Sequence, residues 1–341
     1  LTEWKHDPEV RDVEQPDPAP GQVLVRVAGA GMCHSDLHLI HDFESGMVPF
    51  EPPFTLGHEN AGWVEAVGAG VVGLELGQPV AVYGPTGCGR CHRCVQGMQN
   101  YCEHQAELTS MAAGLGDDGG MAQFMLVHDA RHLVPLDDLD PVEAAPLTDA
   151  GLTPYHAVKR SADLLVAGST ALVIAVGGLG HLGVQILEAV TPATVIAVDT
   201  RTSALDLAAT AGAEHTVQAG DDAAAEIADL TGGKNADVVL DFVGSDSTIQ
   251  LAVAAGRSLG HITVVGIAGG SYPFSFFTVP YEASLATTYW GSIPELMEVL
   301  NLAERGLIRA EVERISIDEA PDGYRRLARG EVDGRLVVVP G

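Results

Sequence analysis

Four of the five cysteines lie within one short stretch of the chain, with the spacing C-x2-C-x2-C-x7-C: Cys88, Cys91, Cys94 and Cys102. Thiolates spaced this closely can converge on one ion, and Zn²⁺ takes four sulfur ligands in closed tetrahedral sites. Two disulfides are one alternative, but the N-terminal residues lack the basic start and apolar run of a secretory signal. Iron is the other, because it takes the same four thiolates. The spacing favours zinc, and we predict a structural zinc lobe at about residues 84–103.

The fifth cysteine, Cys33, stands apart and indicates a different kind of site. A catalytic zinc takes three protein ligands and keeps one position open, so its ligands can come from distant parts of a chain. His58 and Asp149 are the other candidate ligands. Each of the three has an ordinary explanation when taken singly, as a small buried side chain, a hydrogen-bonding ring or a helix cap. Only their combination predicts a metal site.

A glycine-rich turn follows the apolar run at residues 171–176 and precedes a helical stretch: Gly178, Leu179, Gly180, His181, Leu182 and Gly183. In a strand–turn–helix unit the first glycine allows the tight turn, the second lets the backbone approach a pyrophosphate, and the third permits close helix packing. Free N–H groups at the helix N-terminus attract the phosphates. Asp199 follows about 20 residues later, where a carboxylate can bind the adenosine ribose. Together these features predict dinucleotide binding.

The same acid bears on the choice of cofactor. Asp199 would repel the 2′-phosphate that distinguishes NADP from NAD. Arg201 could soften this preference, although a single arginine in a loop after a strand is usually solvated. We therefore predict NAD.

The two halves of the chain differ in their pattern of residues. The first half is broken by Gly and Pro into short β-branched runs such as residues 23–27 and 79–83, which predict an all-β, Greek-key or barrel-like domain. From about Thr153, buried-strand runs alternate with helix-length stretches rich in Ala and Leu, at residues 171–176, 194–198, 236–240 and 261–265. This alternation predicts a parallel, doubly wound sheet. A helix at residues 294–305 and a strand at 335–339 are expected to return to the first domain.

Charge and composition exclude several classes of partner. The chain has 46 acidic residues against 18 basic ones, a formal net charge of −28. Such a surface repels phosphate backbones and anionic lipids, so nucleic-acid and membrane partners are not expected. With 341 residues, 46% of them hydrophobic, the chain is large enough for two cores. We expect a cytoplasmic protein of two domains.

The combined motifs give the chain its resemblance to the zinc-dependent medium-chain alcohol dehydrogenases, and within them to the bacterial Cys-His-Asp branch. The matching segments are Cys33-His34-Ser35-Asp36 with His38, Gly57-His58-Glu59, the four-cysteine lobe, Asp149, the glycine turn with Asp199, and Arg335. The resemblance implies an α/β multi-domain fold. A GroES-like, β-barrel-type catalytic domain would comprise residues 1–150 and 293–341, and a Rossmann domain that binds NAD would comprise residues 151–292. It also implies a homodimer or homotetramer.

The family resemblance also assigns roles to individual residues. Cys33, His58 and Asp149 would hold a catalytic zinc, the second zinc of the chain, with Asp36 bonded to the ligand histidine and Glu59 beside the metal. Ser35 and His38 would pass the substrate proton to solvent, unless Ser35 only caps a helix and His38 only packs beside the cofactor. Further cofactor contacts would come from His34, Thr153, Val243, Val265, Ile267 and Arg335, in addition to the glycine turn, Asp199 and Arg201.

The implied reaction is reversible hydride transfer between NAD(H) and an alcohol, with zinc as the Lewis acid. The implied pocket residues are apolar, which favours a neutral, hydrophobic and secondary alcohol or its ketone: Phe50, Leu115, Ile267, Phe277, Tyr289 and Trp290. The assignment would be EC 1.1.1.-, and most specifically 1.1.1.1. The alternatives are a primary alcohol or aldehyde as substrate, a zinc-free quinone or enoyl reductase, a non-enzymatic descendant of the family, and a zinc-ribbon binding module.

Overall fold

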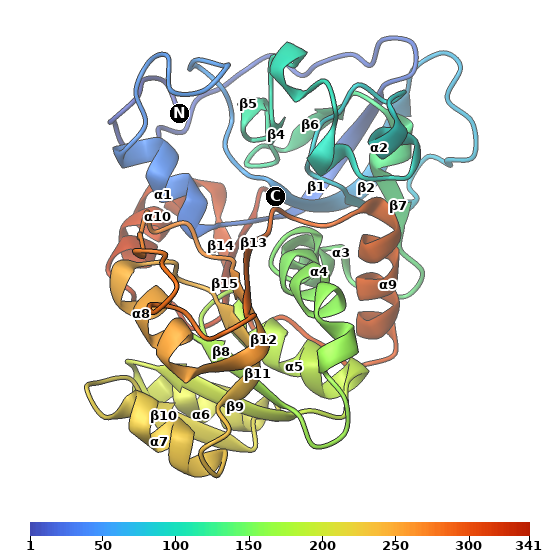
Figure 1. Cartoon of the computed structure of the whole chain (residues 1–341). Coiled ribbons are helices and arrows are strands. Elements are labelled where there is room, and N and C mark those ends of the chain that lie inside the picture. Colours follow the sequence, from blue (N-terminus) through green and yellow to red (C-terminus); the bar gives the residue numbers. More distant parts are fainter. The chain divides into compact units, whose positions relative to one another are not determined.

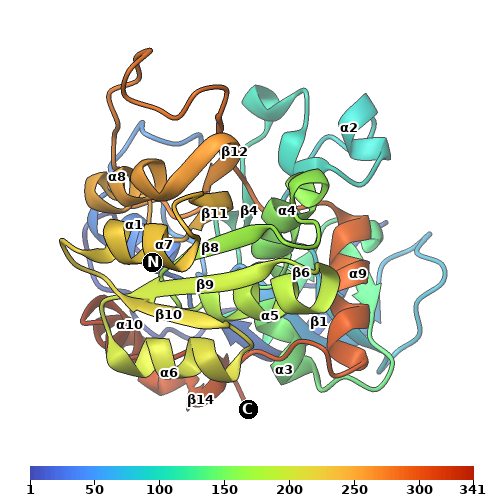
Figure 2. The same ribbon diagram turned by 60° about the horizontal axis from the view of Figure 1, so that its bottom comes forward.

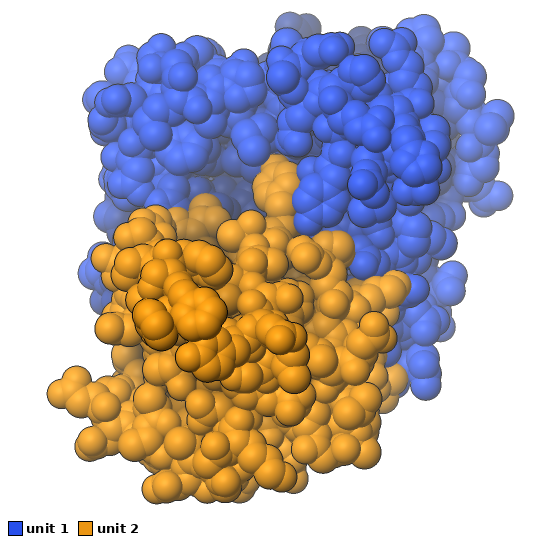
Figure 3. Space-filling model, in the orientation of Figure 1, with its two compact units in different colours: residues 1–152, 290–305, 310–341 blue, residues 153–289, 306–309 orange.

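The computed structural model describes all residues from Leu1 to Gly341 and divides into two compact units, coloured separately in Figure 3. The first unit comprises Leu1–Leu152, Trp290–Arg305 and Ala310–Gly341. The second comprises Thr153–Tyr289 and the short segment Gly306–Arg309. The sequence places the changes of domain at 150/151 and 292/293, whereas the units change at 152/153 and 289/290. No helix is long and apolar enough to cross a membrane.

The first unit is built on a mixed sheet with the strand order β14-β15-β1-β2-β3-β7, in which β6 also pairs with β1 (Figure 1). Its strands are β1 (Val23–Gly31), β2 (Glu59–Val67), β3 (Pro79–Val82), β6 (Phe124–Val127), β7 (Leu133–Pro135), β14 (Val312–Ser316) and β15 (Arg335–Val339). Strand β1 is central, and only Arg26 among its nine residues is exposed. Strand β15 pairs antiparallel with β1, with Ala30 opposite Val338, so the C-terminal strand completes the sheet that the first domain begins.

Helices also belong to this unit: the helix predicted at residues 294–305 is confirmed, whereas the all-β prediction for the first half did not include the helices found there. They are α1 (His34–His41), α2 (His92–Val95), α3 (Pro141–Ala144), α9 (Ile293–Glu304) and α10 (Ala320–Ala328), with the 3-10 turns η1 (Gln99–Tyr101), η2 (Gln105–Glu107), η3 (Ala130–His132), η4 (Ala145–Thr148) and η6 (Ile317–Glu319). Two short strands, β4 (Ala112–Ala113) and β5 (Gly116–Asp117), form a separate pair. Helices α1, α2 and α3 have eight residues or fewer, too short for a clear helical period in the sequence.

The second unit contains a six-stranded sheet in which every neighbouring pair is parallel. Its order is β10-β9-β8-β11-β12-β13, with β8 (Thr170–Ile174), β9 (Thr194–Asp199), β10 (His215–Gln218), β11 (Ala236–Asp241), β12 (Gly256–Val264) and β13 (Ser284–Thr287). The connecting elements are α4 (Leu152–Arg160), which starts at the boundary of the units, η5 (Ala162–Leu164), α5 (Gly180–Val190), α6 (Thr202–Thr210), α7 (Ala223–Leu230) and α8 (Asp246–Ala255). Figure 2 shows β10, β9, β8 and β11 side by side. The predicted parallel α/β fold is confirmed.

The order of these strands creates a switch point beside β8. The chain proceeds outward from β8 to β9 and β10 on one side, and then from β11 to β13 on the other. In open α/β sheets, ligands bind at the carboxyl ends of the strands where the winding reverses. Strand β8 leads directly into the glycine turn, so this turn lies at the position where such a fold binds a ligand.

Candidate metal centres and dinucleotide site

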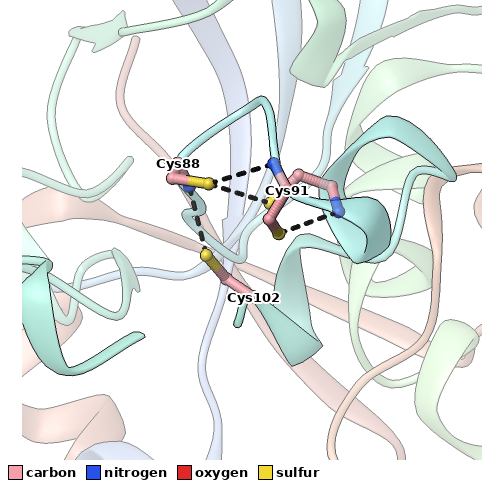
Figure 4. A group of neighbouring side chains, drawn as sticks. Cys88, Cys91 and Cys102 are labelled. Carbon is pink, nitrogen blue, oxygen red and sulfur yellow. Dashed lines mark hydrogen bonds between the residues drawn. The ribbon is translucent and has the colours of Figure 1, made fainter. Parts of the chain in front are cut away.

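The four clustered cysteines meet in the first unit, around α2 and η1. Their Sγ atoms all lie within 4.8 Å of one another. No sulfur is in a disulfide, although Cys88 Sγ lies only 4.0 Å from Cys94 Sγ. Figure 4 shows Cys88, Cys91 and Cys102 pointing towards a common centre. The structure therefore gives the disulfide alternative no support, and the converging sulfurs fit a tetrahedral metal ion.

Backbone N–H groups around this cluster favour thiolates. Cys91 N–H donates to Cys88 Sγ at 3.3 Å, and Cys88 N–H donates to Cys102 Sγ at 3.3 Å. The N–H of Cys94 donates to Cys91 Sγ at 3.5 Å, and mainly this bond lowers the pKa of Cys91 to about 6. Burial raises the pKa of Cys94 to about 12. These hydrogen bonds favour the thiolate form of Cys91, and a bound dication would favour it at all four sulfurs.

A second group of metal-binding side chains is buried elsewhere in the same unit. Cys33, His58, Glu59 and Asp149 bring their ligand atoms within 4.8 Å of one another. Asp149 Oδ2 lies 3.5 Å from His58 Nε2 and 4.0 Å from Cys33 Sγ. One thiol, one imidazole and carboxylates form a donor set of the kind that zinc accepts in catalytic sites. The structure brings together the three ligands predicted from distant parts of the sequence.

The sheet explains why these residues meet. Strands β1 and β2 are antiparallel with Gly31 opposite Glu59, so the chain just after β1 lies beside the chain just before β2. Cys33 follows the end of β1, and His58 precedes the start of β2, after Gly57 at φ 102°. A Cβ atom on Gly31 would overlap the Glu59 carboxylate, so glycine is required there. The segment from Pro53 to His58 has no regular secondary structure before β2 begins.

Asp36 links two of the candidate ligands. Its Oδ1 lies 3.1 Å from His58 Nδ1, and its Oδ2 accepts a hydrogen bond from the Cys33 N–H at 3.1 Å. A carboxylate beside Nδ1 keeps a proton on that nitrogen and leaves Nε2 free to bind a metal. The sequence predicts the contact with His58, but not the second one with the Cys33 backbone.

Buried charges around Cys33 determine its ionisation. Burial opposes the thiolate, but the positive charges of Arg335 and His58 outweigh it and lower the pKa of Cys33 to about 7. Burial also opposes the charge of His58, whereas Asp36 and Asp149 raise the pKa of His58 well above its usual value. Arg335 forms a buried ion pair with Glu59. The pocket therefore stabilises the anionic form of Cys33 that a metal requires.

The glycine turn of the second unit is shaped by close contacts. Strand β8 ends at Ile174, two residues before the predicted strand at residues 171–176 would end. The backbone turns at the next residue, Ala175, which has φ 71°. A Cβ atom on Gly180 would overlap the Ala175 carbonyl oxygen, and one on Gly183 would lie 2.9 Å from the Phe242 ring. His181 is fully buried, with Nδ1 2.9 Å from the Gly177 carbonyl oxygen. Gly180 is thus needed for packing inside the turn, and no side chain caps the N-terminus of α5.

Asp199 lies at the end of β9, beside this turn. Its Oδ2 accepts a hydrogen bond from the Val176 N–H at 2.7 Å, and its Oδ1 accepts one from the Arg201 N–H at 2.9 Å. The Arg201 side chain reaches within 3.7 Å of the same carboxylate. Asp199 therefore fastens two adjacent strand ends in addition to any contact with a ribose.

Comparisons with known proteins decide the family. Residues 19–138 match the family described as Alcohol dehydrogenase GroES-like domain, and residues 178–305 match Zinc-binding dehydrogenase. The chain is 34% identical over 340 residues to the NAD-dependent alcohol dehydrogenase of Sulfurisphaera tokodaii, covering 97% of this chain and 96% of the relative. The chain belongs to the zinc-containing medium-chain alcohol dehydrogenase family. The recognition made from the motifs is confirmed.

Two solved structures support this membership. The alcohol dehydrogenase of the archaeon Aeropyrum pernix superposes with a TM-score of 0.92 at 39% identity, covering 100% of this chain and 98% of the other. The acetophenone reductase of Geotrichum candidum, solved in complex with NAD, superposes with a TM-score of 0.83 at 32% identity, covering 96% and 92%. The GroES-like and doubly wound units are therefore the two domains of this dehydrogenase family.

The residues predicted to carry the proton lie on α1 of the dehydrogenase. Ser35 Oγ is 3.4 Å from His58 Nε2, the nitrogen that faces the metal-binding group. Cys33 occupies the N-cap position of α1, so the alternative that Ser35 caps this helix is wrong. His38 Nδ1 lies 2.6 Å from Asp42 Oδ2 one turn further along, and 29% of its side chain is exposed.

The predicted pocket residues have different environments. The Trp290 ring meets the His58 ring edge to face, with centroids 5.5 Å apart, and Trp290 adopts φ 52°, which is rare for a bulky residue. Phe50 is instead buried in an aromatic core against Phe54, and Leu115 packs partly buried against the same core. In the second unit, Tyr289 is half-buried, whereas Ile267 and Phe277 are 58% and 86% exposed.

The remaining predicted cofactor residues are divided between the two units. Thr153, Val243 and Val265 belong to the second, where Val243 and Val265 follow β11 and β12 at the carboxyl edge of the sheet. His34 and Arg335 belong to the first, where Arg335 is held by Glu59. Sequence reasoning missed Tyr324, which donates a hydrogen bond to Asp36 at 2.9 Å. A tyrosine in an amphipathic helix gives no signal beyond core packing.

Proposed function

We propose that this protein is an NAD-dependent alcohol dehydrogenase (EC 1.1.1.-) that interconverts a neutral, hydrophobic secondary alcohol and its ketone. The observation that carries the proposal is the buried group of Cys33, His58 and Asp149, with the Trp290 ring packed against the histidine. Relatives named as NAD-dependent alcohol dehydrogenase and acetophenone reductase support the reaction and the class of substrate. We also propose a cytoplasmic location, where the free thiols stay reduced.

The donor sets fit two zinc ions with different tasks. The sulfur-only cluster would hold a structural ion, and Cys33, His58 and Asp149 would hold a catalytic one with Glu59 close by. When bound, the catalytic zinc supplies Lewis-acid polarisation of an alcohol or carbonyl oxygen. The protein orients the ligand histidine, because Asp36 lies against the His58 ring. It also excludes water, because Trp290 packs against that ring.

The first unit also offers a path for the substrate proton. Ser35 Oγ lies beside His58 Nε2, and a hydroxyl can accept one proton while it donates another. We propose that Ser35 takes the proton of the alcohol and that His38, partly exposed beside Asp42, releases it to water. His38 is suited to the outer end because its side chain is partly exposed to water.

Ser35→Ala is expected to lower kcat for alcohol oxidation by about 10²-fold or more, the usual size of general acid–base assistance. Both zinc ions should remain, because the serine is not a proposed ligand. His38→Gln should cost less, since water can replace the outer group. Turnover is measured against pH for both variants, and a Ser35→Ala enzyme as fast as wild type at every pH would rule out the relay.

The proposed cofactor site is the carboxyl edge of the second sheet. The uncapped N-terminus of α5 would face the pyrophosphate, and Asp199 would bind the adenosine ribose. NAD supplies the hydride acceptor for this reaction. The hydrogen bonds from Val176 and Arg201 hold the Asp199 carboxylate in place before any cofactor binds.

Asp199→Gly is expected to raise the preference for NADP over NAD, measured as the ratio of kcat/KM values, by at least about tenfold. The change removes both the ribose ligand and the charge that repels a 2′-phosphate. Asp206→Asn, an exposed position on α6, is the control and should leave the ratio unchanged. Equal use of both cofactors by the wild type would show that Asp199 does not set the preference.

A substrate panel tests the proposed class of alcohol. Secondary alcohols such as 2-pentanol and 1-phenylethanol are compared with 1-pentanol and with a polyol, by NADH formation. We expect secondary alcohols to give the highest kcat/KM, because an apolar pocket has no partners for further hydroxyl groups. A primary alcohol as the best substrate would favour the first alternative. A zinc-free reductase or a non-enzymatic relative would show no activity that a chelator removes and zinc restores.

The second unit supports an oligomer. Strand β13 is the last of its sheet, so its outer edge carries unpaired backbone groups. Aromatic side chains beside it are largely exposed and contact one another, namely Phe276, Phe277 and Tyr281. An open sheet edge next to such a patch fits a second copy of this chain related by a two-fold axis. We propose a homodimer through this edge, or a homotetramer of such dimers.

A further inference from the structure

Tyr324 connects the C-terminal helix of the first unit with the proposed catalytic metal site. It lies on α10 and is only 3% exposed. Its hydroxyl donates a hydrogen bond to Asp36 Oδ2 at 2.9 Å. Asp36 is itself fully buried and faces His58. A residue near the end of the chain therefore contacts the carboxylate that orients a proposed zinc ligand.

Gly323 leaves room for two flexible side chains where α10 packs against the rest of the unit. A Cβ atom at this position would lie 2.8 Å from Ile315 Cδ1 and 2.9 Å from Met32 Sδ. Met32 directly precedes Cys33, so glycine at 323 allows the helix to rest against the segment that carries a proposed ligand. The neighbouring side chain, Tyr324, then extends to Asp36.

The two oxygens of Asp36 have separate partners. Oδ2 accepts from the Cys33 N–H and from the Tyr324 hydroxyl, while Oδ1 faces His58 Nδ1. Two donors on one oxygen fix the rotation of the carboxylate, so the other oxygen stays 3.1 Å from His58 Nδ1. Without the phenol, Oδ2 of this fully buried carboxylate would keep only the Cys33 backbone N–H as a donor.

Tyr324 has one other polar neighbour, Met121, whose Sδ is 3.1 Å from the hydroxyl oxygen. The phenol has a single proton to donate, and a carboxylate accepts a much stronger hydrogen bond than a thioether does. The contact with Met121 is therefore packing, and the bond to Asp36 is the one expected to carry the effect.

We propose that Tyr324 is a positioning residue for the catalytic metal: by fixing Asp36, it holds His58 and Cys33 in the geometry that binds the ion. This inference rests on the proposed function, because it takes Cys33, His58 and Asp149 as the ligands. Replacing the residue that is bonded directly to a metal-ligating histidine typically costs about 10–100-fold in metal affinity, and Tyr324 acts on that residue, Asp36. The hydrogen bonds of the sulfur-only cluster come from backbone N–H groups within its own lobe and do not involve Tyr324. Its affinity for zinc should therefore be unaffected.

The test measures metal binding instead of turnover. Zinc affinity of Tyr324→Phe is measured by competition with a chromophoric chelator, and the visible spectrum is recorded after Co²⁺ replaces the labile ion. We expect the affinity of one site to fall about tenfold or more and the Co²⁺ bands to shift, while the other site is unchanged. Met121→Leu, which keeps the phenol–carboxylate bond, should behave as wild type. Tyr324→His, which keeps a ring N–H donor, should recover part of the affinity, and it also serves if the phenylalanine variant does not fold.

The outcomes separate this inference from the proposed function. If the wild type binds two ions, Asp149→Asn binds one, and Tyr324→Phe equals wild type in affinity and spectrum, the role of Tyr324 is wrong and the function stands. Equal losses in Tyr324→Phe and Met121→Leu would assign the effect to packing and overturn the role as well. If the wild type and Asp149→Asn bind the same number of ions, the proposed catalytic site itself fails.

Discussion

Asp149→Asn is expected to lower kcat/KM for alcohol oxidation by at least about 10³-fold, which corresponds to about 4 kcal/mol of transition-state stabilisation. The carboxylate lies 3.5 Å from His58 Nε2 and 4.0 Å from Cys33 Sγ, so the change removes a charged ligand from the centre of the group. An amide has a similar shape but is a poor zinc ligand. The steady-state rate with NAD and the zinc content are measured together.

The fold should survive this change, because Asp149 lies at the end of η4 and belongs to no strand pairing. Asp138→Asn, at an exposed position of the same unit, is the control and should keep full activity. An Asp149→Asn enzyme with wild-type activity and two zinc ions would remove Asp149 from the ligand set. A misfolded variant, detected by circular dichroism, would instead show that this buried carboxylate is structural.

Cys94→Ser is expected to act on stability, in contrast to Asp149→Asn. Cys94 is buried inside the sulfur-only cluster, and the loss of one thiolate there should release the ion. The lobe is also joined to the rest of its unit, since Ile293 N–H donates to the Gly97 carbonyl at 2.8 Å and Tyr83 contacts Asn100 at 3.3 Å. Loosening the lobe should therefore weaken the start of α9 as well.

We expect Cys94→Ser to lose roughly 3–4 kcal/mol of folding free energy. At about 2–4 °C per kcal/mol, this loss lowers the midpoint of thermal unfolding by about 10 °C. Differential scanning calorimetry with zinc analysis measures it. Cys33→Ser is the matched comparison, because it changes the cysteine of the other cluster and should lose activity with a smaller change in Tm. If Cys94→Ser kept both its zinc and its Tm, the cluster would not be a structural metal site.

Much of the fold could be predicted because three central strands of the second unit, β8, β9 and β11, are almost entirely buried. A parallel sheet covered on both faces gives continuous apolar runs, and β8, β9 and β11 are recognisable for this reason. The ends of the strands were harder to predict. Strand β8 stops at Ile174 because Ala175 has φ 71°, a backbone conformation that an alanine in the sequence does not indicate. Helix α1 entered the prediction only as the alternative in which Ser35 caps a helix, because its eight residues mix His, Ser and Asp with Leu and Ile.

The candidate metal ligands could be picked out from the sequence because few side chains have their chemistry, and those side chains stand in recognisable motifs. Their neighbours could not. Tyr324 reaches Asp36 from α10, Met121 contacts the Tyr324 hydroxyl from a loop, and Gly323 packs against Met32 and Ile315. Nothing in their residue types distinguishes them from ordinary core residues. The exposure of Phe277 could not be predicted either, because an aromatic residue in a sequence predicts burial unless a partner surface is known.

The most direct test of the central claim is zinc analysis of the pure protein combined with a chelator experiment on NADH-linked activity. The account predicts two zinc ions per chain. Brief treatment with a chelator should remove one ion together with the activity, and added zinc should restore both, while the second ion stays with the folded protein. Full activity in a protein that holds one zinc or none would contradict the account.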